Sequence, residues 1–104
     1  TGQVTFAARD SDFDGHKIKQ GEIMAMTGGK ISFVDTDIER VTLKLVKSML
    51  KRDSEFVTVI YGEDITDEQA ASLEQQLNEK FGNKVEITFV NGGQPVYYYI
   101  ISVE

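Results

Sequence analysis

FVTVIYGEDITDEQAASLEQQLNEKFGNKVEITFV, residues 56–90, is the stretch of this chain that decides its fold class. Residues 56–61 form a continuous apolar run, which predicts a strand of the fully buried kind. Residues 84–90 alternate between apolar and polar side chains, as expected for a second strand. A helix between the two runs completes the pattern, so the stretch predicts a βαβ unit with a right-handed crossover.

The helix within this stretch has recognisable ends. Thr66 and Gln69 have the spacing of a capping box, in which each side chain accepts a hydrogen bond from the other residue's amide. Gly82 stands where a left-handed cap would end the helix. The apolar residues between these ends repeat at helical spacing and predict one buried face: Ala70, Leu73, Leu77 and Phe81.

Extended segments and one helix are predicted for the first half of the chain. Gly28 and Gly29 separate two apolar runs, and this is a strong hairpin signal because both glycines can adopt positive φ. Thr36 and Glu39 have the spacing of a second capping box, which predicts a helix that ends near Arg52.

The last predicted strand covers residues 96–103, after a turn at residues 91–95. Together these segments predict an α/β fold: a two-layer domain with a mixed sheet, a β-hairpin-rich N-terminal half, a C-terminal βαβ unit and a final antiparallel strand. We expect residues 1–104 to be a single domain taken from a larger protein, because the chain has the length of one domain and opens at Thr1. A subdomain boundary near Asp53 is left open.

Composition limits the classes of partner and compartment. The chain has no Cys, which excludes disulfides, thiolate metal sites and a cysteine nucleophile and makes the cytoplasm the default localisation. Its formal net charge of −6 disfavours nucleic acid and anionic membranes as partners, since both are densely negative. No apolar run approaches the roughly 18 residues that a membrane span needs.

Two features resemble sites of chemistry but have simpler interpretations. The run DSDFDG at residues 10–15 matches the first half of an EF-hand loop, yet Gly21 occupies the twelfth position, where a bidentate Glu belongs. We interpret it as an Asp-rich turn, with calcium binding as the minor alternative. His16 is the only His, and no nucleophile or orienting group is placed beside it. We therefore assign no catalytic, cofactor-binding or metal-ligating residue, and we do not expect the isolated domain to be an enzyme.

Acidic charge is concentrated in one segment. Residues 53–79 contain eight Asp and Glu residues and no Lys or Arg. The helix dipole explains part of this excess at Asp67 and Glu68, and a solvated acidic face remains an alternative for the rest. A basic partner would relieve the repulsion and bind faster, so the segment predicts a protein-binding surface.

Three segments carry a resemblance to a known family. They are residues 58–66 (TVIYGEDIT), residues 91–104 (NGGQPVYYYIISVE) and residues 21–30, which contain IMAMTGGK. The first two resemble the extreme C-terminus of the catalytic subunit of bacterial fatty acid kinase, which is a DAK2-domain, dihydroxyacetone-kinase-like family. The third resembles the stretch upstream. The resemblance covers most of this chain but only a terminal piece of the parent protein.

The resemblance implies a C-terminal domain related in fold to DegV-like fatty-acid-binding proteins, within an ATP-dependent kinase subunit. It implies that this domain docks the DegV-like fatty-acid-binding subunit, whose fatty acid is phosphorylated to acyl phosphate, and that it contacts the rest of the kinase chain. No catalytic residue of the family has a counterpart here. Binding of a small ligand such as a lipid, or self-association, is the alternative. The residues predicted to contact the partner are acidic: Glu63, Asp64, Asp67, Glu68 and Glu74.

Overall fold

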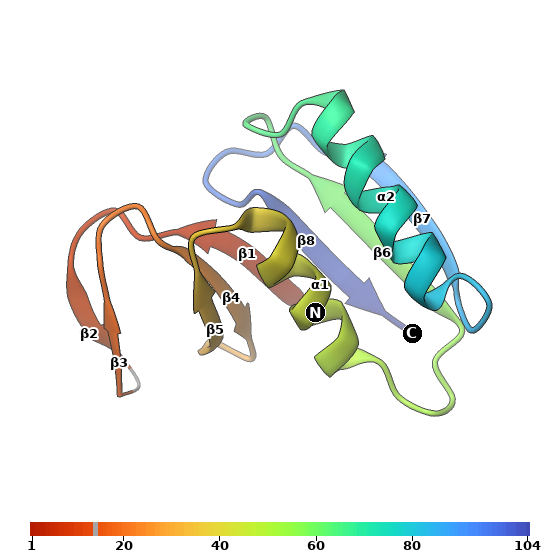
Figure 1. Cartoon of the computed structure of the whole chain (residues 1–104), viewed down its shortest axis with the longest axis horizontal. Helices are drawn as coiled ribbons and strands as arrows, with labels where there is room; N and C mark the ends of the chain where they lie inside the picture. Colours follow the sequence, from red (N-terminus) through yellow and green to blue (C-terminus); the bar gives the residue numbers. More distant parts are fainter. Residues whose placement is uncertain (14) are drawn as a thin grey trace.

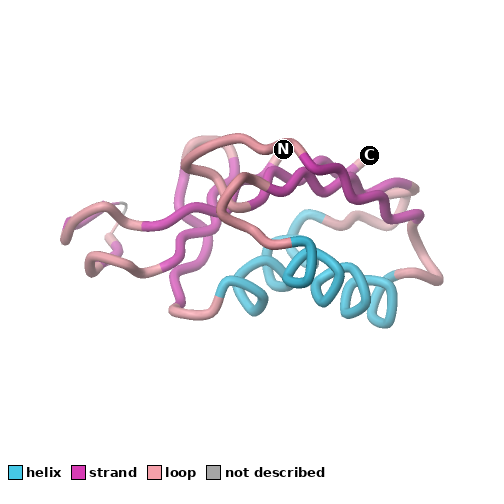
Figure 2. Tube along the Cα trace, turned by 90° about the horizontal axis from the view of Figure 1, so that it is seen from above, coloured by secondary structure: helices cyan, strands magenta, loops and turns pink. Residues whose placement is uncertain are grey.

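A computed structural model of the chain describes residues 1–13 and 15–104. Six of its strands form one mixed sheet in the order β5-β4-β1-β8-β6-β7, and both helices lie on the same face of that sheet (Figures 1 and 2). The remaining two strands form a separate hairpin. The predicted two-layer α/β class with a mixed sheet is therefore confirmed. The elements in chain order are β1 (Gly2–Phe6), β2 (Ser11–Phe13), β3 (His16–Ile18), β4 (Ile23–Thr27), β5 (Lys30–Asp35), α1 (Ile38–Met49), β6 (Phe56–Tyr61), α2 (Asp67–Phe81), β7 (Glu86–Asn91) and β8 (Tyr99–Val103).

The βαβ unit forms as predicted. Strands β6 and β7 pair in parallel from Phe56 opposite Glu86 to Tyr61 opposite Asn91, with α2 between them in the chain. The capping box at the start of α2 is present, because Thr66 accepts from the Gln69 amide and Gln69 accepts from the Thr66 amide. Strand β6 is thus joined to β7 through a helix whose N-terminus is fixed by a capping box.

The predicted left-handed cap at Gly82 is wrong. Gly82 has φ −62° and ψ −18°, which is the right-handed region, and its amide still donates to the Asn78 carbonyl. The amides of Lys84 and Val85 both donate to the Phe81 carbonyl. A right-handed turn therefore leads the chain from α2 into β7 without the positive φ that a left-handed cap requires.

The first helix also begins differently from the prediction. Asp37, not Thr36, is the N-cap of α1, and its carboxylate accepts from the Arg40 amide at 3.2 Å. The capping box predicted from Thr36 and Glu39 is therefore wrong, and α1 ends at Met49, before Arg52. Asp and Thr both suit an N-cap, so sequence alone did not distinguish two neighbouring candidates.

The hairpin between β4 and β5 confirms the glycine signal. Gly28 and Gly29 have φ values of 58° and 78°, and Thr27 pairs with Lys30 across them. This two-residue connection matches the right-handed twist of the strands, because both central residues adopt positive φ.

Strand β6 is buried on one face only, so the prediction that this strand is fully buried is wrong. In β6 the side chains of Val57 and Val59 are buried, but Phe56 is 46% exposed. The helices cover one face of β6 only, so its residues alternate between core and surface even though nearly all of them are apolar.

Strand β8 joins the two halves of the sheet. It pairs antiparallel with β1 on one side and with β6 on the other, as the predicted final antiparallel strand requires. It begins at Tyr99, later than the predicted Val96, because Pro95 and Val96 form an irregular turn in which Val96 has φ 73°.

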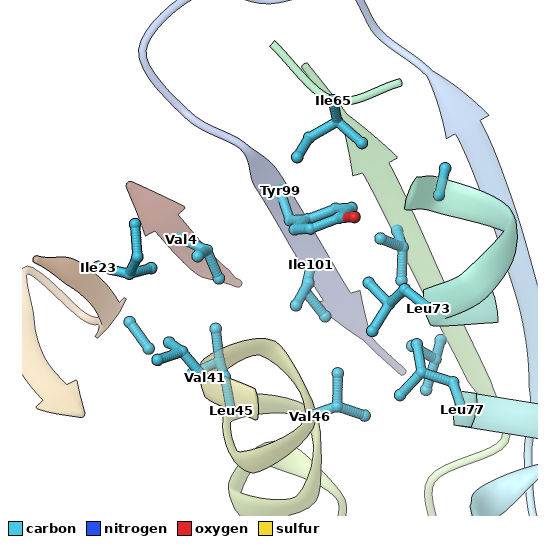
Figure 3. Packing of buried hydrophobic residues seen from close by; sticks show 14 of the residues in the cluster. Val4, Ile23, Val41, Leu45, Val46, Ile65, Leu73, Leu77, Tyr99 and Ile101 are labelled. Carbon is cyan, nitrogen blue, oxygen red and sulfur yellow. The ribbon is translucent and has the colours of Figure 1, made fainter. Parts of the chain in front are cut away.

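The main core lies between the sheet and the two helices. Figure 3 shows Leu45 and Val46 of α1 and Leu73 and Leu77 of α2 directed toward Ile101 and Tyr99 of β8. Full burial of each such aliphatic side chain contributes about 1.5–3 kcal/mol relative to an exposed one. A smaller cluster joins Ile18 of β3 to Ala7 and to Ile31 of β5.

Candidate docking surface

The predicted acidic residues lie around the connection from β6 to α2. Glu63 and Asp64 are in the loop between these elements, and Asp67 and Glu68 form the first turn of α2. All four are exposed, and Glu74, further along the helix, is half-buried. We call these five residues the acidic end. Asp53 and Glu55 precede β6 and therefore lie at the opposite end of that strand.

The loop of the acidic end is fixed by backbone hydrogen bonds to the connection between β7 and β8. The Gly62 amide donates to the Tyr98 carbonyl at 2.9 Å, and the Glu63 amide donates to the Gln94 carbonyl at 3.0 Å. A Cβ atom on Gly62 would collide with the Tyr97 carbonyl and lie 2.7 Å from the Gln94 carbonyl. Glycine is thus required by close backbone approach, and the acidic side chains are presented from a well-defined frame.

Tyr61 links two of the predicted residues. Its hydroxyl donates to a carboxylate oxygen of Asp67 at 3.1 Å. Partial desolvation raises the pKa of Tyr61, and the bond to Asp67 and the negative charges of Asp67 and Glu74 raise it further. The structure therefore brings Asp67 and Glu74 together near one phenol group.

The acidic end has no internal counter-charge. In residues 1–13 and 15–104, the ion pairs within 4.0 Å join Arg40 to Asp35 and to Asp37, and none involves the five predicted residues. Their negative charge is therefore available to a positively charged partner.

Two exposed apolar side chains follow in the neighbouring connection. Val96 is 55% exposed and Tyr97 is 40% exposed. The positive φ of Val96 is unfavourable for a β-branched residue and is held by tertiary bonds, since the Thr5 hydroxyl donates to the Val96 carbonyl at 2.8 Å. Sequence reasoning missed this feature, because Pro95 restricts its own φ but gives no signal for a left-handed residue after it.

Glu39 connects the two helices close to this region. Its carboxylate accepts from the Ser72 hydroxyl at 2.9 Å and from the Gln76 side chain at 2.6 Å. With Asp37 as the N-cap, Glu39 is the second residue of α1 and not the third, where a capping box requires it. The bonds to Ser72 and Gln76 tie α1 to α2 across the surface of the helical layer.

A hollow of about 470 Å³ lies between the starts of the two helices. Asp37, Glu39, Gln69 and the buried Tyr99 contribute to its wall. Burial raises the pKa of Tyr99. Because two carboxylic acid side chains line the hollow, it is poorly suited to the carboxylate of a fatty acid.

The calcium interpretation of residues 10–15 falls partly outside the described residues, since Asp14 is not among them. Asp10 accepts from the Gln20 amide at 2.7 Å, and Ser11 to Phe13 pair with His16 to Ile18 as a hairpin. Across the described ranges, no three side chains of His, Cys, Asp or Glu gather in a way that could hold a metal ion. The same ranges contain no helix that is long and apolar enough to cross a membrane.

Comparison with known proteins gives a match over all of residues 1–104. The matching family is the FakA-like C-terminal domain, named for its place in a fatty acid kinase. The chain belongs to this family. Membership confirms the resemblance found in the sequence.

Relatives of this FakA-like domain occur in Bacillus and Staphylococcus. Protein YloV of Bacillus subtilis (strain 168) is 40% identical over 104 residues. Uncharacterized proteins of Staphylococcus haemolyticus (strain JCSC1435) and Staphylococcus aureus (strain USA300) are 45% and 36% identical over 105 and 108 residues. Each match covers 100% of this chain and 19% of the relative. The chain thus spans about a fifth of the length of the curated relatives it matches.

Proposed function

We propose that this chain is the non-catalytic C-terminal domain of a fatty acid kinase and that it docks the DegV-like fatty-acid-binding subunit. Docking would present the bound fatty acid for phosphorylation to acyl phosphate by the ATP-dependent part of the kinase, in the cytoplasm. Family membership over the whole chain supports the kinase assignment. The observation that carries docking is the acidic end, whose five carboxylates form no ion pair with any residue in the described part of the chain.

The acidic end has the properties that favour recognition of a basic protein surface. Glu63, Asp64, Asp67 and Glu68 are exposed, and the loop that bears two of them is hydrogen-bonded to a neighbouring connection. A preformed loop loses little conformational entropy on binding. Complementary charge increases the rate of encounter and fixes the orientation of the partner. The exposed Tyr97 can supply an aromatic contact at the edge of this surface.

The direct test is analytical ultracentrifugation of the chain mixed with the fatty-acid-binding subunit, with both proteins at micromolar concentrations and low salt. We expect a complex. Reversal of Glu63, Asp64, Asp67 and Glu68 to Lys should weaken it by at least about tenfold, because favourable charge pairs become repulsive.

The matched control reverses four acidic residues at the other end of the molecule: Asp53, Glu55, Glu79 and Glu86. Asp53 and Glu55 precede β6, Glu79 lies in the last turn of α2, and Glu86 begins β7. The change in net charge is therefore the same as in the first variant, but it lies at the other end of the molecule. We expect the control variant to keep most of the affinity. Absence of a complex would reject docking, and equal weakening by both variants would move the contact away from the acidic end.

A further inference from the structure

A second charged surface, of opposite sign, lies where the two helices end. Seven of the chain's 11 basic residues line two adjoining hollows there, of about 630 and 450 Å³, which share Lys47 and Phe81. We call this surface the basic groove. One of the seven, Arg40, is paired with Asp35, and the other six are Lys44, Lys47, Lys51, Arg52, Lys80 and Lys84.

The basic groove is assembled by the parallel arrangement of the helices. Both helices start at the hollow beside Tyr99 and end beside the groove. Figure 1 shows that α1 and α2 run in the same general direction. Lys47 and Lys80 lie in the last turns of α1 and α2, where a cation compensates the helix dipole. Lys51, Arg52 and Lys84 follow the helix ends within three residues, where the dipoles account for part of their preference, and Lys44 lies in the middle of α1.

Among the described residues, carboxylates compensate Arg40 but not the other six residues. Neither hollow has Asp or Glu in its wall. Across residues 1–13 and 15–104, none of the six side chains forms an ion pair within 4.0 Å. The chain as a whole is acidic, with a formal net charge of −6, so this concentration of positive charge opposes the overall composition. A ligand for the groove must therefore carry negative charge.

The floor of the groove is apolar. Leu43, Leu50 and Phe81 are half-buried and leave part of their surface between the lysines. A simple anion would use the charge but leave this floor in contact with water. An amphipathic helix with carboxylates along its edges and apolar side chains on one face would satisfy both, as in other helix-in-groove interactions.

A flat anionic membrane fits less well, because the acidic end belongs to the same helical layer. From Glu68 to Lys80 the axis of α2 rises roughly 18 Å. This is about twice the screening length at physiological salt. A membrane resting on the helical layer would meet both surfaces and be repelled by one. A helix lying in the groove would be screened from Glu68 and the loop before it, and Glu74, roughly 9 Å along the axis from Lys80, is the one residue of the acidic end on α2 within about a screening length.

We propose that the basic groove binds an acidic amphipathic helix of a protein partner. This site is distinct from the acidic end in position and in the sign of its charge. It gives the domain a second contact, through which a protein with an acidic helix is held independently of any protein bound at the acidic end.

The test uses a fluorescein-labelled helical peptide of about 14 residues, roughly 21 Å long, with Glu along its edges and Leu on one face. Fluorescence anisotropy should show saturable binding at low salt. Replacing its Glu by Gln, or its Leu by Ser, should abolish binding, since charge and apolar contact are both needed. In the protein, reversal of Lys47, Lys51 and Lys84 to Glu should weaken binding by at least about tenfold.

The control variant reverses Lys17, Lys19 and Lys30, which are exposed on the β2–β3 and β4–β5 hairpins. It changes net charge by the same amount outside the groove and should leave affinity within about twofold. Circular dichroism melting establishes that both variants fold. Equal weakening in the two variants, or no peptide binding, overturns the proposal. Binding to phosphatidylglycerol vesicles that is tighter than peptide binding and lost on groove reversal overturns it in favour of a membrane.

Discussion

The acidic end and the basic groove occupy opposite ends of one helical layer. Both follow from the same physical rule, since Asp67 and Glu68 favour the start of α2 and Lys80 favours its end. Because α1 and α2 run in the same direction, their starts and their ends each gather at one place. The helix dipoles therefore explain in part why acidic residues gather at one end of the helical layer and basic residues at the other. Only the charged residues beyond the terminal turns indicate partners.

The two surfaces differ in how they are supported. Part of the acidic end, Glu63 and Asp64, is carried by a loop that depends on backbone contacts of Gly62 with the β7–β8 connection. The basic groove is carried mainly by two helices whose buried faces form the main core. Damage to the loop should thus affect the acidic end first, and this difference can be tested.

Substitution of Gly62 by Val, in the loop of the acidic end, should have the largest effect on stability. The new side chain would meet the Tyr97 and Gln94 carbonyls, and we expect a loss of about 2–3 kcal/mol in the free energy of unfolding. Urea denaturation followed by circular dichroism measures it. The control is Glu63→Val at the next, exposed position, which should change stability by less than about 0.5 kcal/mol. A Gly62→Val variant as stable as the wild type would contradict the close approach.

The same contrast explains what could be predicted from sequence. The acidic end was predictable because its residues lie in one segment, and the βαβ unit because its capping box and its strand patterns are local. The basic groove combines α1 with residues 51–52 and 80–84, so it exists only after the helices pack. The burial of β6 was predicted wrongly because its own sequence does not show whether other segments cover one face of the strand or both.

The two predicted capping boxes give a sharper test at the start of each helix. Thr66→Ala removes a side chain that accepts from the Gln69 amide and should destabilise the chain by about 1 kcal/mol. Thr36→Ala should cost less than about 0.5 kcal/mol, because Asp37 caps α1 in its place. Thermal and urea denaturation of both variants provide the comparison. Equal losses would mean that Thr36 also caps its helix, contrary to the structure.

Titration of Tyr61 should give the smallest effect and reports on the acidic end alone. Desolvation, the bond to Asp67 and the charge of Glu74 raise its pKa, so the folded state favours the neutral phenol. This contribution to stability is complete below the ordinary pKa of about 10 and is lost as pH rises through the higher folded value.

Asp67→Asn should lower the pKa of Tyr61 part of the way toward its ordinary value, because the negative charge is removed while desolvation remains. Carbon NMR of the Tyr61 ring, recorded from about pH 8 to 12 so as to bracket the ordinary tyrosine pKa, measures the shift. Glu68→Gln removes an equal charge from the same helical turn, but Glu68 does not contribute to the raised pKa, so it should leave the titration unchanged. If the two variants titrate alike, Asp67 is not held against Tyr61, and the acidic end is a set of independent carboxylates without the fixed geometry that docking would use.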